Sequence, residues 1–198
     1  KDIHTGADIL LPRGNAIKIS ARVLLSLISS SSEPVDINLV SWNGGKKNNA
    51  IPRACSVMFS VKKEDEPAII ERFNKEIDNI QDYYRLYEPE LKINLKSKPD
   101  LKLQGIPIYS VNQSKQIIRS ISSIPSGPIV MSPEIPGFVE TSNNLGTIYT
   151  DIDTLTIGNM PRSSKDNELK YWCNVIAGCG LNSGANVSVG EGYSGWIP

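Results

Sequence analysis

The sequence predicts an α+β fold, in which helices pack on one face of an antiparallel β-sheet. Hydrophobic residues recur every three or four positions in some segments and alternate with polar residues in others. Neighbouring strand-like segments are joined by short turns, which is typical of antiparallel pairing. The alternation of helix and strand then occurs a second time along the chain. The elements are ferredoxin-like, and the pattern leaves open whether they are duplicated and whether the sheet is continuous or split into two related halves.

Four segments have helical spacing. The first begins after Asn15, a good helix-capping residue, and carries apolar residues at intervals of three or four. Asp65 and Pro67 open the second, because proline is tolerated in a first turn. The apolar stripes of the four helices are Ile17, Ala21, Leu24 and Ile28; Ile70, Phe73, Ile77, Ile80 and Tyr84; Ile117, Ile118 and Ile121 after a cap at Ser114; and Leu169, Trp172, Cys173 and Ile176 after a cap at Asp166.

Short segments with alternating hydrophobicity predict the strands, and clusters of glycine, proline and asparagine predict the loops between them. A turn is expected at 43–45 and a loop at 125–136. The predicted strands are an extended start at 4–11, then 35–39, 55–61, 91–95, two strands within 147–160, and 187–189.

The bulk composition is that of a soluble globular domain. The chain has 198 residues, 39% hydrophobic and 21% charged, with 21 Lys plus Arg against 21 Asp plus Glu. A neutral net charge gives no electrostatic reason to expect nucleic acid or an anionic membrane as a partner. No apolar run approaches the roughly 20 residues that span a bilayer. The start reads as part of a motif and not as a signal peptide, so we take the chain to be a piece of a larger protein.

The supply of reactive side chains is small. The cysteines Cys55, Cys173 and Cys179 form no CxxC pair, so no disulfide framework is expected and a reducing, cytosolic setting fits. His4 is the only histidine, which makes a metal site within the chain improbable and leaves His4 as the only ordinary candidate base for a nucleophilic serine or cysteine. Phosphate-binding glycine motifs are also absent. From the residues alone, the chain is a scaffold or binding domain with one suggestive histidine.

Several motifs nevertheless carry a family resemblance. They are HTGADI at 4–9 with GNAIK at 14–18, GGK at 44–46 with NAIPR at 49–53, MS at 131–132, VETSNNLG at 139–146, and YSGWIP at 193–198. Their order and spacing resemble the lid, or dimerisation-type, domain of bacterial aminoacyl-histidine dipeptidases, which belong to the clan of two-zinc aminopeptidases, carboxypeptidases and aminoacylases. Two departures are Asp2-Ile3, where the family usually has two glycines, and Ala54, where it usually has an acid.

The resemblance implies that residues 1–198 are a lid inserted into a zinc-binding catalytic domain that this chain lacks. The chain itself would bind no cofactor and be inactive alone, while two zinc ions would activate water in a cytoplasmic parent that hydrolyses Xaa-His dipeptides. His4 matches the lid histidine that stabilises negative charge at the scissile carbonyl. Arg162 matches the arginine that holds the substrate carboxylate. Asn144, and with less weight Asn49, match amide positions that contact substrate.

Two other interpretations stay open. The domain could be a purely structural dimerisation unit that forms a homodimer, which sedimentation of the chain would detect. It could also be a regulatory domain that binds a small molecule, because ferredoxin-like layers host many such roles. The motifs also do not decide whether His4 would act in its own subunit or in a neighbouring one.

Overall fold

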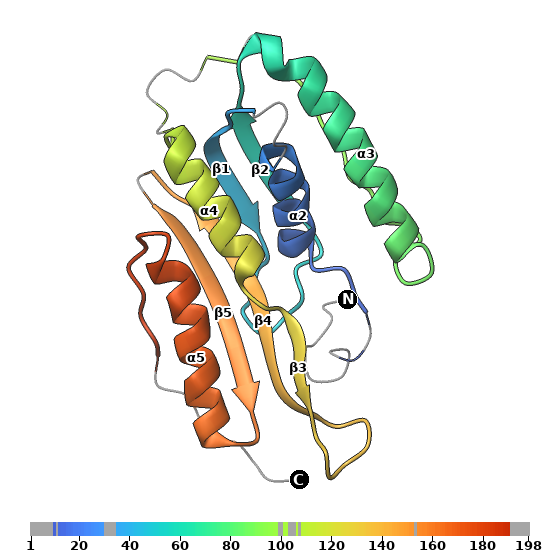
Figure 1. The fold of residues 1–198 in the computed structure, drawn as a ribbon, viewed down its shortest axis with the longest axis vertical. Helices are drawn as coiled ribbons and strands as arrows, with labels where there is room; N and C mark the ends of the chain where they lie inside the picture. The colour runs from blue at the N-terminus through green and yellow to red at the C-terminus, as the bar shows by residue number, and fades with distance from the viewer. Residues whose placement is uncertain are drawn as a thin grey trace.

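The computed structural model describes residues 10, 12–29, 35–98, 101–102, 106, 108–152 and 154–190. Within these residues, one β-sheet carries its helices on one face, as Figure 1 shows, which confirms the predicted α+β class. The elements in chain order are α2 (Ala16–Ile28), β1 (Asn38–Gly44), β2 (Cys55–Ser60), the 3-10 turn η1 (Lys63–Asp65), α3 (Glu66–Tyr84), α4 (Val111–Ser123), β3 (Gly127–Met131), β4 (Val139–Thr150), β5 (Leu155–Ser163) and α5 (Asp166–Leu181).

The five strands of the described chain form a single antiparallel sheet built around β4, the longest strand. β5 pairs with β4 from Thr150↔Leu155 to Thr141↔Ser163 and so occupies one of its edges. β1 meets β4 at Gly44↔Ile148, and β3 pairs with the other end of β4. Because a strand has only two edges, β1 and β3 share the second edge of β4 end to end. β2 pairs with β1 and extends the sheet.

The order of elements occurs twice along the chain. The first half runs α2, β1, β2, α3, and the second runs α4, β4, β5, α5 with β3 as an addition. The halves join through the antiparallel contact of β1 with β4 and the packing of α2 beside α4. The sheet is therefore continuous in the described residues, although the elements that build it are repeated.

The hydrophobic core lies between the sheet and the helices, with Trp42 among its largest fully buried side chains. The predicted stripe of α2 is confirmed, because all four of its residues are buried. Asn15 caps this helix as expected: its side-chain oxygen accepts hydrogen bonds from the backbone N–H groups of Ile17 and Lys18. Burial of this amphipathic helix, more than its intrinsic propensity, holds α2 in place.

Three details of the predicted helices are wrong. Ile69 of α3 is buried and Ile70 is 43% exposed, because both lie within a turn of Phe73 and only the position of α2 selects between them. Ser110, not Ser114, caps α4 through a capping box with Gln113. The buried Ser114 hydroxyl instead accepts from the Leu39 N–H of β1. The N-cap position of α5 is Lys165, and Asp166 is the first helical residue.

Two strand predictions and one loop prediction also need correction, and the strand predicted at 35–39 lies at Asn38–Gly44 instead. Residues 91–95 alternate in burial and pack on the core through Leu91, Ile93 and Leu95, but they form no ladder within the described chain. Residues 187–189 form none either. Conversely, the predicted loop 125–136 contains β3, whose Pro128 is tolerated because β3 pairs with a neighbour on one side only among the described strands. The alternation reports which side chains face the core, and not whether a partner strand is present.

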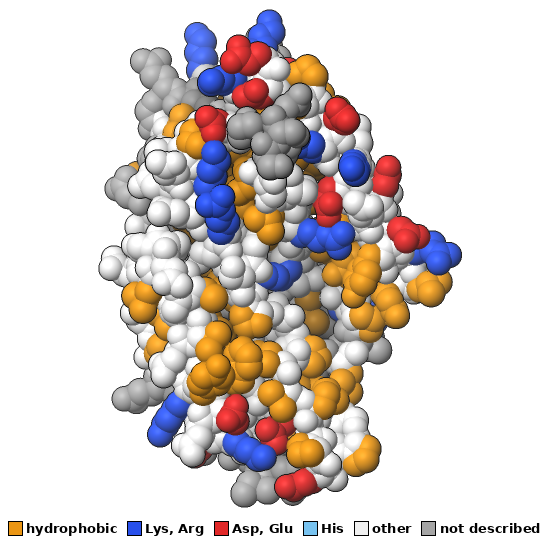
Figure 2. Space-filling model, in the orientation of Figure 1, with side chains coloured by type: hydrophobic (Ala, Val, Ile, Leu, Met, Phe, Trp, Pro, Cys, Tyr) orange, Lys and Arg blue, Asp and Glu red, His pale blue; other side chains and the backbone are white. Residues whose placement is uncertain are grey.

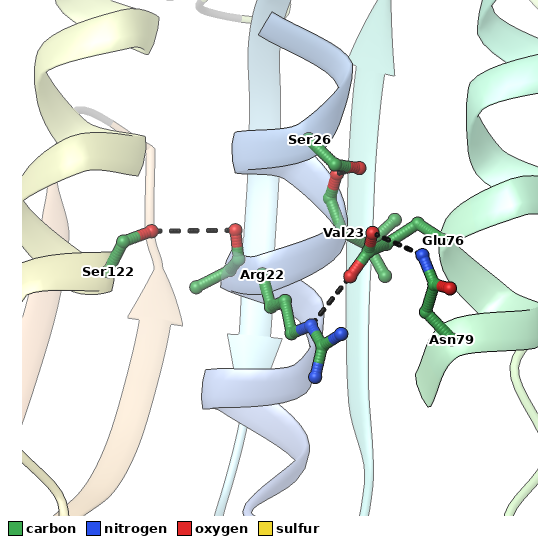
Figure 3. Close-up of polar contacts among 7 residues, drawn as sticks. Arg22, Val23, Ser26, Glu76, Asn79 and Ser122 are labelled. Atoms are coloured by element: carbon green, nitrogen blue, oxygen red, sulfur yellow. Dashed lines mark hydrogen bonds and ion pairs between the residues drawn. The ribbon is translucent and has the colours of Figure 1, made fainter. Parts of the chain in front are cut away.

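Side-chain contacts link the central helix α2 to the helix on each side, as Figure 3 shows. The Arg22 Nε atom donates to Glu76 Oε1 of α3 at 2.6 Å, and Asn79 donates to the other oxygen of Glu76. On the opposite side, the Ser122 hydroxyl of α4 donates to the backbone carbonyl of Ala21 at 3.4 Å. These contacts fix the lateral order of α3, α2 and α4 but are partly exposed, so each contributes little to stability.

Lys18 makes the strongest polar link between the two halves. Its Nζ donates to the backbone carbonyls of Ile121, Ser122 and Ile124 at 3.1, 2.6 and 2.7 Å. These carbonyls lie at the C-terminal end of α4, where a helix lacks intrahelical donors and carries partial negative charge. Burial lowers the pKa of Lys18 to about 8. Lys18 of the first half thus supplies hydrogen bonds to the carbonyls at the C-terminal end of α4 in the second half.

Replacing Lys18 by methionine is expected to lower the free energy of unfolding by about 2 kcal/mol, because three carbonyls lose their shared donor. Chemical denaturation with Lys75→Met as the control, an exposed lysine on α3, measures this difference. The folded protein binds the Lys18 proton less tightly than the unfolded chain, so the loss should grow as pH rises from about 8 toward 10.5. Equal effects of the two substitutions would contradict this role.

Candidate functional site

The motif segments at 44–53 and 139–146 meet on the sheet. Asn144 of β4 is buried, and its Nδ2 donates to the carbonyls of Asn48 and Ala50 at 2.7 and 2.9 Å. The Thr147 hydroxyl donates to Asn48 Oδ1 at 2.9 Å. Both hydrogens of the Asn144 amide are therefore used to hold the turn that carries Asn49, which is itself exposed. The structure brings two of the predicted site residues, Asn144 and Asn49, into one small unit.

Glycines allow the segment after β1 to approach the sheet backbone. Gly45 has φ +73°, and a Cβ added there would lie on the carbonyl of Gly146. A Cβ on Gly146 would lie 2.5 Å from Asn48 Cα, and one on Gly158 of β5 would overlap the Asn48 and Thr147 side chains. Real side chains do not tolerate such distances, so these positions require glycine for steric reasons. The glycines of the GGK and NNLG motifs thus allow the backbone after β1 to pack directly against the backbone of β4.

The GNAIK segment joins the same unit from the helix side. The Ala16 N–H donates to the Pro52 carbonyl at 2.9 Å, and Asn15 Nδ2 donates to the Leu145 carbonyl at 2.9 Å. Asn15 Nδ2 also contacts the Ser126 hydroxyl, which accepts from the Leu145 N–H. Three motifs that are far apart in the sequence therefore form one hydrogen-bonded junction between α2, β4 and the 45–54 segment.

Arg162 lies on β5, close to this junction. It stands opposite Ser142 of β4, while Asn144 stands opposite Met160, so Arg162 and Asn144 share a sheet face two positions apart. Arg162 Nη2 contacts Met160 Sδ at 3.7 Å, and its buried Nε has no hydrogen-bond partner among the described residues. A guanidinium with a buried, unused donor is suited to receive a carboxylate or carbonyl oxygen.

Arg162 borders a wide cleft. The cleft encloses about 1630 Å³ and is lined by β5, by α4 and α5, and by the segment after α5. Glu140, which also lines it, is buried and forms an ion pair with Lys165 at 3.0 Å. The hydrogen bond that Lys165 donates to the Glu140 carboxylate raises the pKa of Lys165. Because Glu140 is already paired with Lys165, the Arg162 guanidinium remains available to bind a ligand in the cleft.

The described residues contain no group of three or more His, Cys, Asp and Glu side chains able to hold a metal ion. Cys55, Cys173 and Cys179 are free and partly exposed. Burial raises the pKa of Cys55, whose Sγ lies 3.2 Å from Trp42 Nε1 and 3.3 Å from Ser20 Oγ. None of the helices in the described part of the chain is long and apolar enough to cross a membrane. The site is built from amide and guanidinium groups, which bind and orient ligands.

The predicted catalytic residue His4 lies outside the described residues, as does the YSGWIP segment. Sequence reasoning predicted Asn15 as a helix cap but missed its side-chain bonds to Leu145 and Ser126, and it missed the role of Lys18, although the GNAIK motif contained both. It also missed Glu140, which the VETSNNLG motif contained. Polar residues inside a motif were a usable signal, but periodicity does not reveal their partners, which for Asn15 and Lys18 lie more than 80 residues away.

The fold and the junction define an α+β domain in which one antiparallel sheet carries its helices on one face. Residues 11–85, which contain α2, β1, β2 and α3, match the family described as the peptidase dimerisation domain. This match confirms the family resemblance carried by the motifs.

The particular relatives are dipeptidases. The chain is 28% identical to the cytosol non-specific dipeptidase of Escherichia coli (strain K12) over 204 residues, which cover 98% of this chain and 39% of that protein. The crystal structure of aminoacylhistidine dipeptidase from Vibrio alginolyticus matches with a TM-score of 0.86 and 28% identity, over 100% of this chain and 39% of that one. The chain thus spans about two fifths of the length of these relatives.

Proposed function

We propose that this chain is the lid of a cytoplasmic zinc metallopeptidase that hydrolyses Xaa-His dipeptides. The observation that carries the proposal is the junction of the three motifs, which places Asn144 and Asn49 together and Arg162 on the same sheet face as Asn144. The similarity to a dipeptidase and an aminoacylhistidine dipeptidase supports the reaction class and the substrate class. A lid of this kind closes over a catalytic domain and completes the substrate site.

Arg162 is proposed to hold the carboxylate of the dipeptide. Its Nε is buried without a partner among the described residues, and it stands at the end of β5 beside a cleft. Two parallel hydrogen bonds from a guanidinium fix both the position and the orientation of a carboxylate. This interaction exists before and during the reaction, so it contributes mainly to substrate binding.

Asn144 and Asn49 are proposed to act as one substrate-binding unit. The Nδ2 of Asn144 is committed to the carbonyls of Asn48 and Ala50, so Asn144 has only its Oδ1 to offer a substrate N–H. Its larger contribution is to hold the turn on which Asn49 is exposed. Asn49 would then present its amide to the peptide from a fixed backbone.

His4 is proposed to donate an N–H to the developing oxyanion, which strengthens the bond as charge builds. The described residues supply no metal-ligand cluster, so two zinc ions would be bound by the rest of the full-length protein. When bound, such ions supply an activated water for hydrolysis. The part of this chain is to orient the dipeptide and to exclude bulk water on closure.

The repeated halves favour action within one subunit. Residues 11–85 match a dimerisation domain, and the second half of the chain places the same order of elements beside it. One chain thus presents two such modules side by side, so we propose that His4 serves its own subunit. Mixed oligomers of a His4→Ala protein and a zinc-site variant test this: they should stay inactive, and recovered activity would contradict it.

Replacing Arg162 by methionine in the full-length protein is expected to raise KM for an Xaa-His dipeptide by about 10–100-fold, with a smaller fall in kcat, because carboxylate binding is lost. Steady-state kinetics measure the split. Arg162→Lys should recover only part of the loss, since an ammonium cannot form the two parallel bonds. Arg119→Met, an exposed position on α4, is the matched control. Unchanged KM in Arg162→Met would remove Arg162 from the site.

A structural dimerisation role is the alternative that one observation favours, namely the match of residues 11–85 to a dimerisation domain. Sedimentation of the chain distinguishes the structural dimerisation role from the lid role. A stable homodimer together with wild-type KM in Arg162→Met would support the structural role. A monomer with the expected KM change would support the lid.

A further inference from the structure

A second, smaller pocket lies beside the motif junction and shares one residue, Asn144, with the proposed substrate site. It encloses about 170 Å³ beside the residues that lead into α2. Its walls come from Arg13, from Ile51, from Tyr83 and Tyr84 at the end of α3, and from Ser126 and Pro128 at the start of β3. Elements from both halves of the chain therefore meet around one small space.

Arg13 contributes donors that nothing in the described chain uses. Its Nε is buried without a partner, and its guanidinium makes no hydrogen bond to any described residue. The nearest acid is Glu88, whose Oε1 lies 3.8 Å from Arg13 Nη1, beyond hydrogen-bond distance. The same Glu88 oxygen accepts from the Gly14 N–H at 3.3 Å. Arg13 is therefore held near a carboxylate but is not satisfied by it.

The Ser126 hydroxyl adds a second unused donor. Its oxygen accepts from Asn15 Nδ2 and from the Leu145 N–H, both at 3.2 Å, and its own hydrogen has no acceptor among the described residues. A hydroxyl oxygen that already accepts two hydrogen bonds has only its own hydrogen left, so its third hydrogen bond must be a donated one. The lining thus offers unused donors from Arg13 and Ser126.

Apart from the amides of Asn15 and Asn144, the remaining wall of the pocket is largely apolar. Ile51, Pro12 and Pro128 line it together with Tyr83 and Tyr84, whose rings contact edge to face at 4.9 Å between centroids. Figure 2 shows hydrophobic side chains gathered at the right of the view, over the C-terminal end of α3, where Tyr83, Leu86 and Tyr87 are exposed. Unused donors set among apolar walls are the pattern of a small-ligand site.

From these contacts we propose that the Arg13 pocket binds the carboxylate of a small organic ligand. The guanidinium and the Ser126 hydroxyl receive the carboxylate oxygens, and the apolar wall accommodates a short aliphatic group. A volume of about 170 Å³ admits a ligand the size of a small amino acid. The pocket takes its positive charge from Arg13 and not from Arg162, so loss of carboxylate binding in Arg13→Met and a change of KM in Arg162→Met are separate outcomes.

Titration of the chain with sodium acetate, followed by the Arg Nε–H signals in ¹H–¹⁵N NMR, tests the proposal at constant ionic strength. The Arg13 signal should shift in a saturable manner, and acetamide should produce less than a tenth of the effect. Arg13→Met should abolish the local shifts, while Arg119→Met should leave them unchanged. Equal responses to acetate and acetamide, or equal responses of wild type and Arg13→Met, would overturn the proposal.

Glu88→Gln tests the site without removing Arg13. Glutamine keeps an oxygen that accepts from the Gly14 N–H, but it removes the negative charge that competes with a ligand carboxylate. Acetate should therefore bind at least three-fold more tightly, and unchanged or weaker binding would count against the site. Acetyl-dialanine separates two sources of carboxylate: tighter binding than acetate assigns the pocket to peptide C-termini, and weaker binding assigns it to small free acids.

Discussion

Replacing Gly45 by alanine is expected to destabilise the domain by about 2–5 kcal/mol. Gly45 has φ +73°, a conformation that costs a side-chain-bearing residue about 1–2 kcal/mol. The added Cβ would also fall on the carbonyl of Gly146, which is backbone of the central strand β4 and cannot rotate away. Relieving that clash must lift the 45–50 turn and strain the bonds from Asn144, which adds about 1–3 kcal/mol.

Gly137→Ala is the matched control, because Gly137 has φ +78° and a Cβ there would meet nothing within 4 Å. It carries the same backbone penalty without the clash. Chemical denaturation of both variants separates the two contributions, and the difference between them is expected to be about 1–3 kcal/mol, the contribution of the clash. Equal destabilisation by Gly45→Ala and Gly137→Ala would contradict the close contact between the turn at Gly45 and the backbone of β4.

The class of fold and most elements could be predicted from the sequence, because side-chain periodicity reports local geometry. The stripe of α2, the strand β2 and the pair β4 and β5 follow directly from it. The errors occur where a choice depends on a distant partner. Ile69 is buried in place of Ile70 because α2 lies on that side, and 91–95 remains unpaired in the described chain although its alternation is that of a strand.

The candidate site was predictable only in part and for a related reason. The motifs identified Asn144, Asn49 and Arg162. Their spacing along the chain does not reveal that the Asn144 amide donates both of its hydrogens to the carbonyls of Asn48 and Ala50. Arg13 carries no motif signal at all. Its unused donors become visible only when the end of α3 and the start of β3 are placed around it.

Replacing His4 by alanine is expected to lower kcat of the full-length protein by about 10²–10³-fold, the usual effect of removing one donor from an oxyanion site. The effect should fall on kcat more than on KM, since the bond strengthens only as charge develops. His4→Gln keeps an N–H donor and should retain more activity than alanine. Lys75→Met, at an exposed position on α3, should leave both constants unchanged.

The measurement that tests the lid assignment most directly is hydrolysis of an Xaa-His dipeptide by the zinc-loaded full-length protein, with wild type compared to a folded His4→Ala variant. The account predicts an active wild type and a variant whose kcat is lower by at least about two orders of magnitude. Equal rates would contradict it, because the domain would then be a structural or dimerising unit that supplies no group to the reaction.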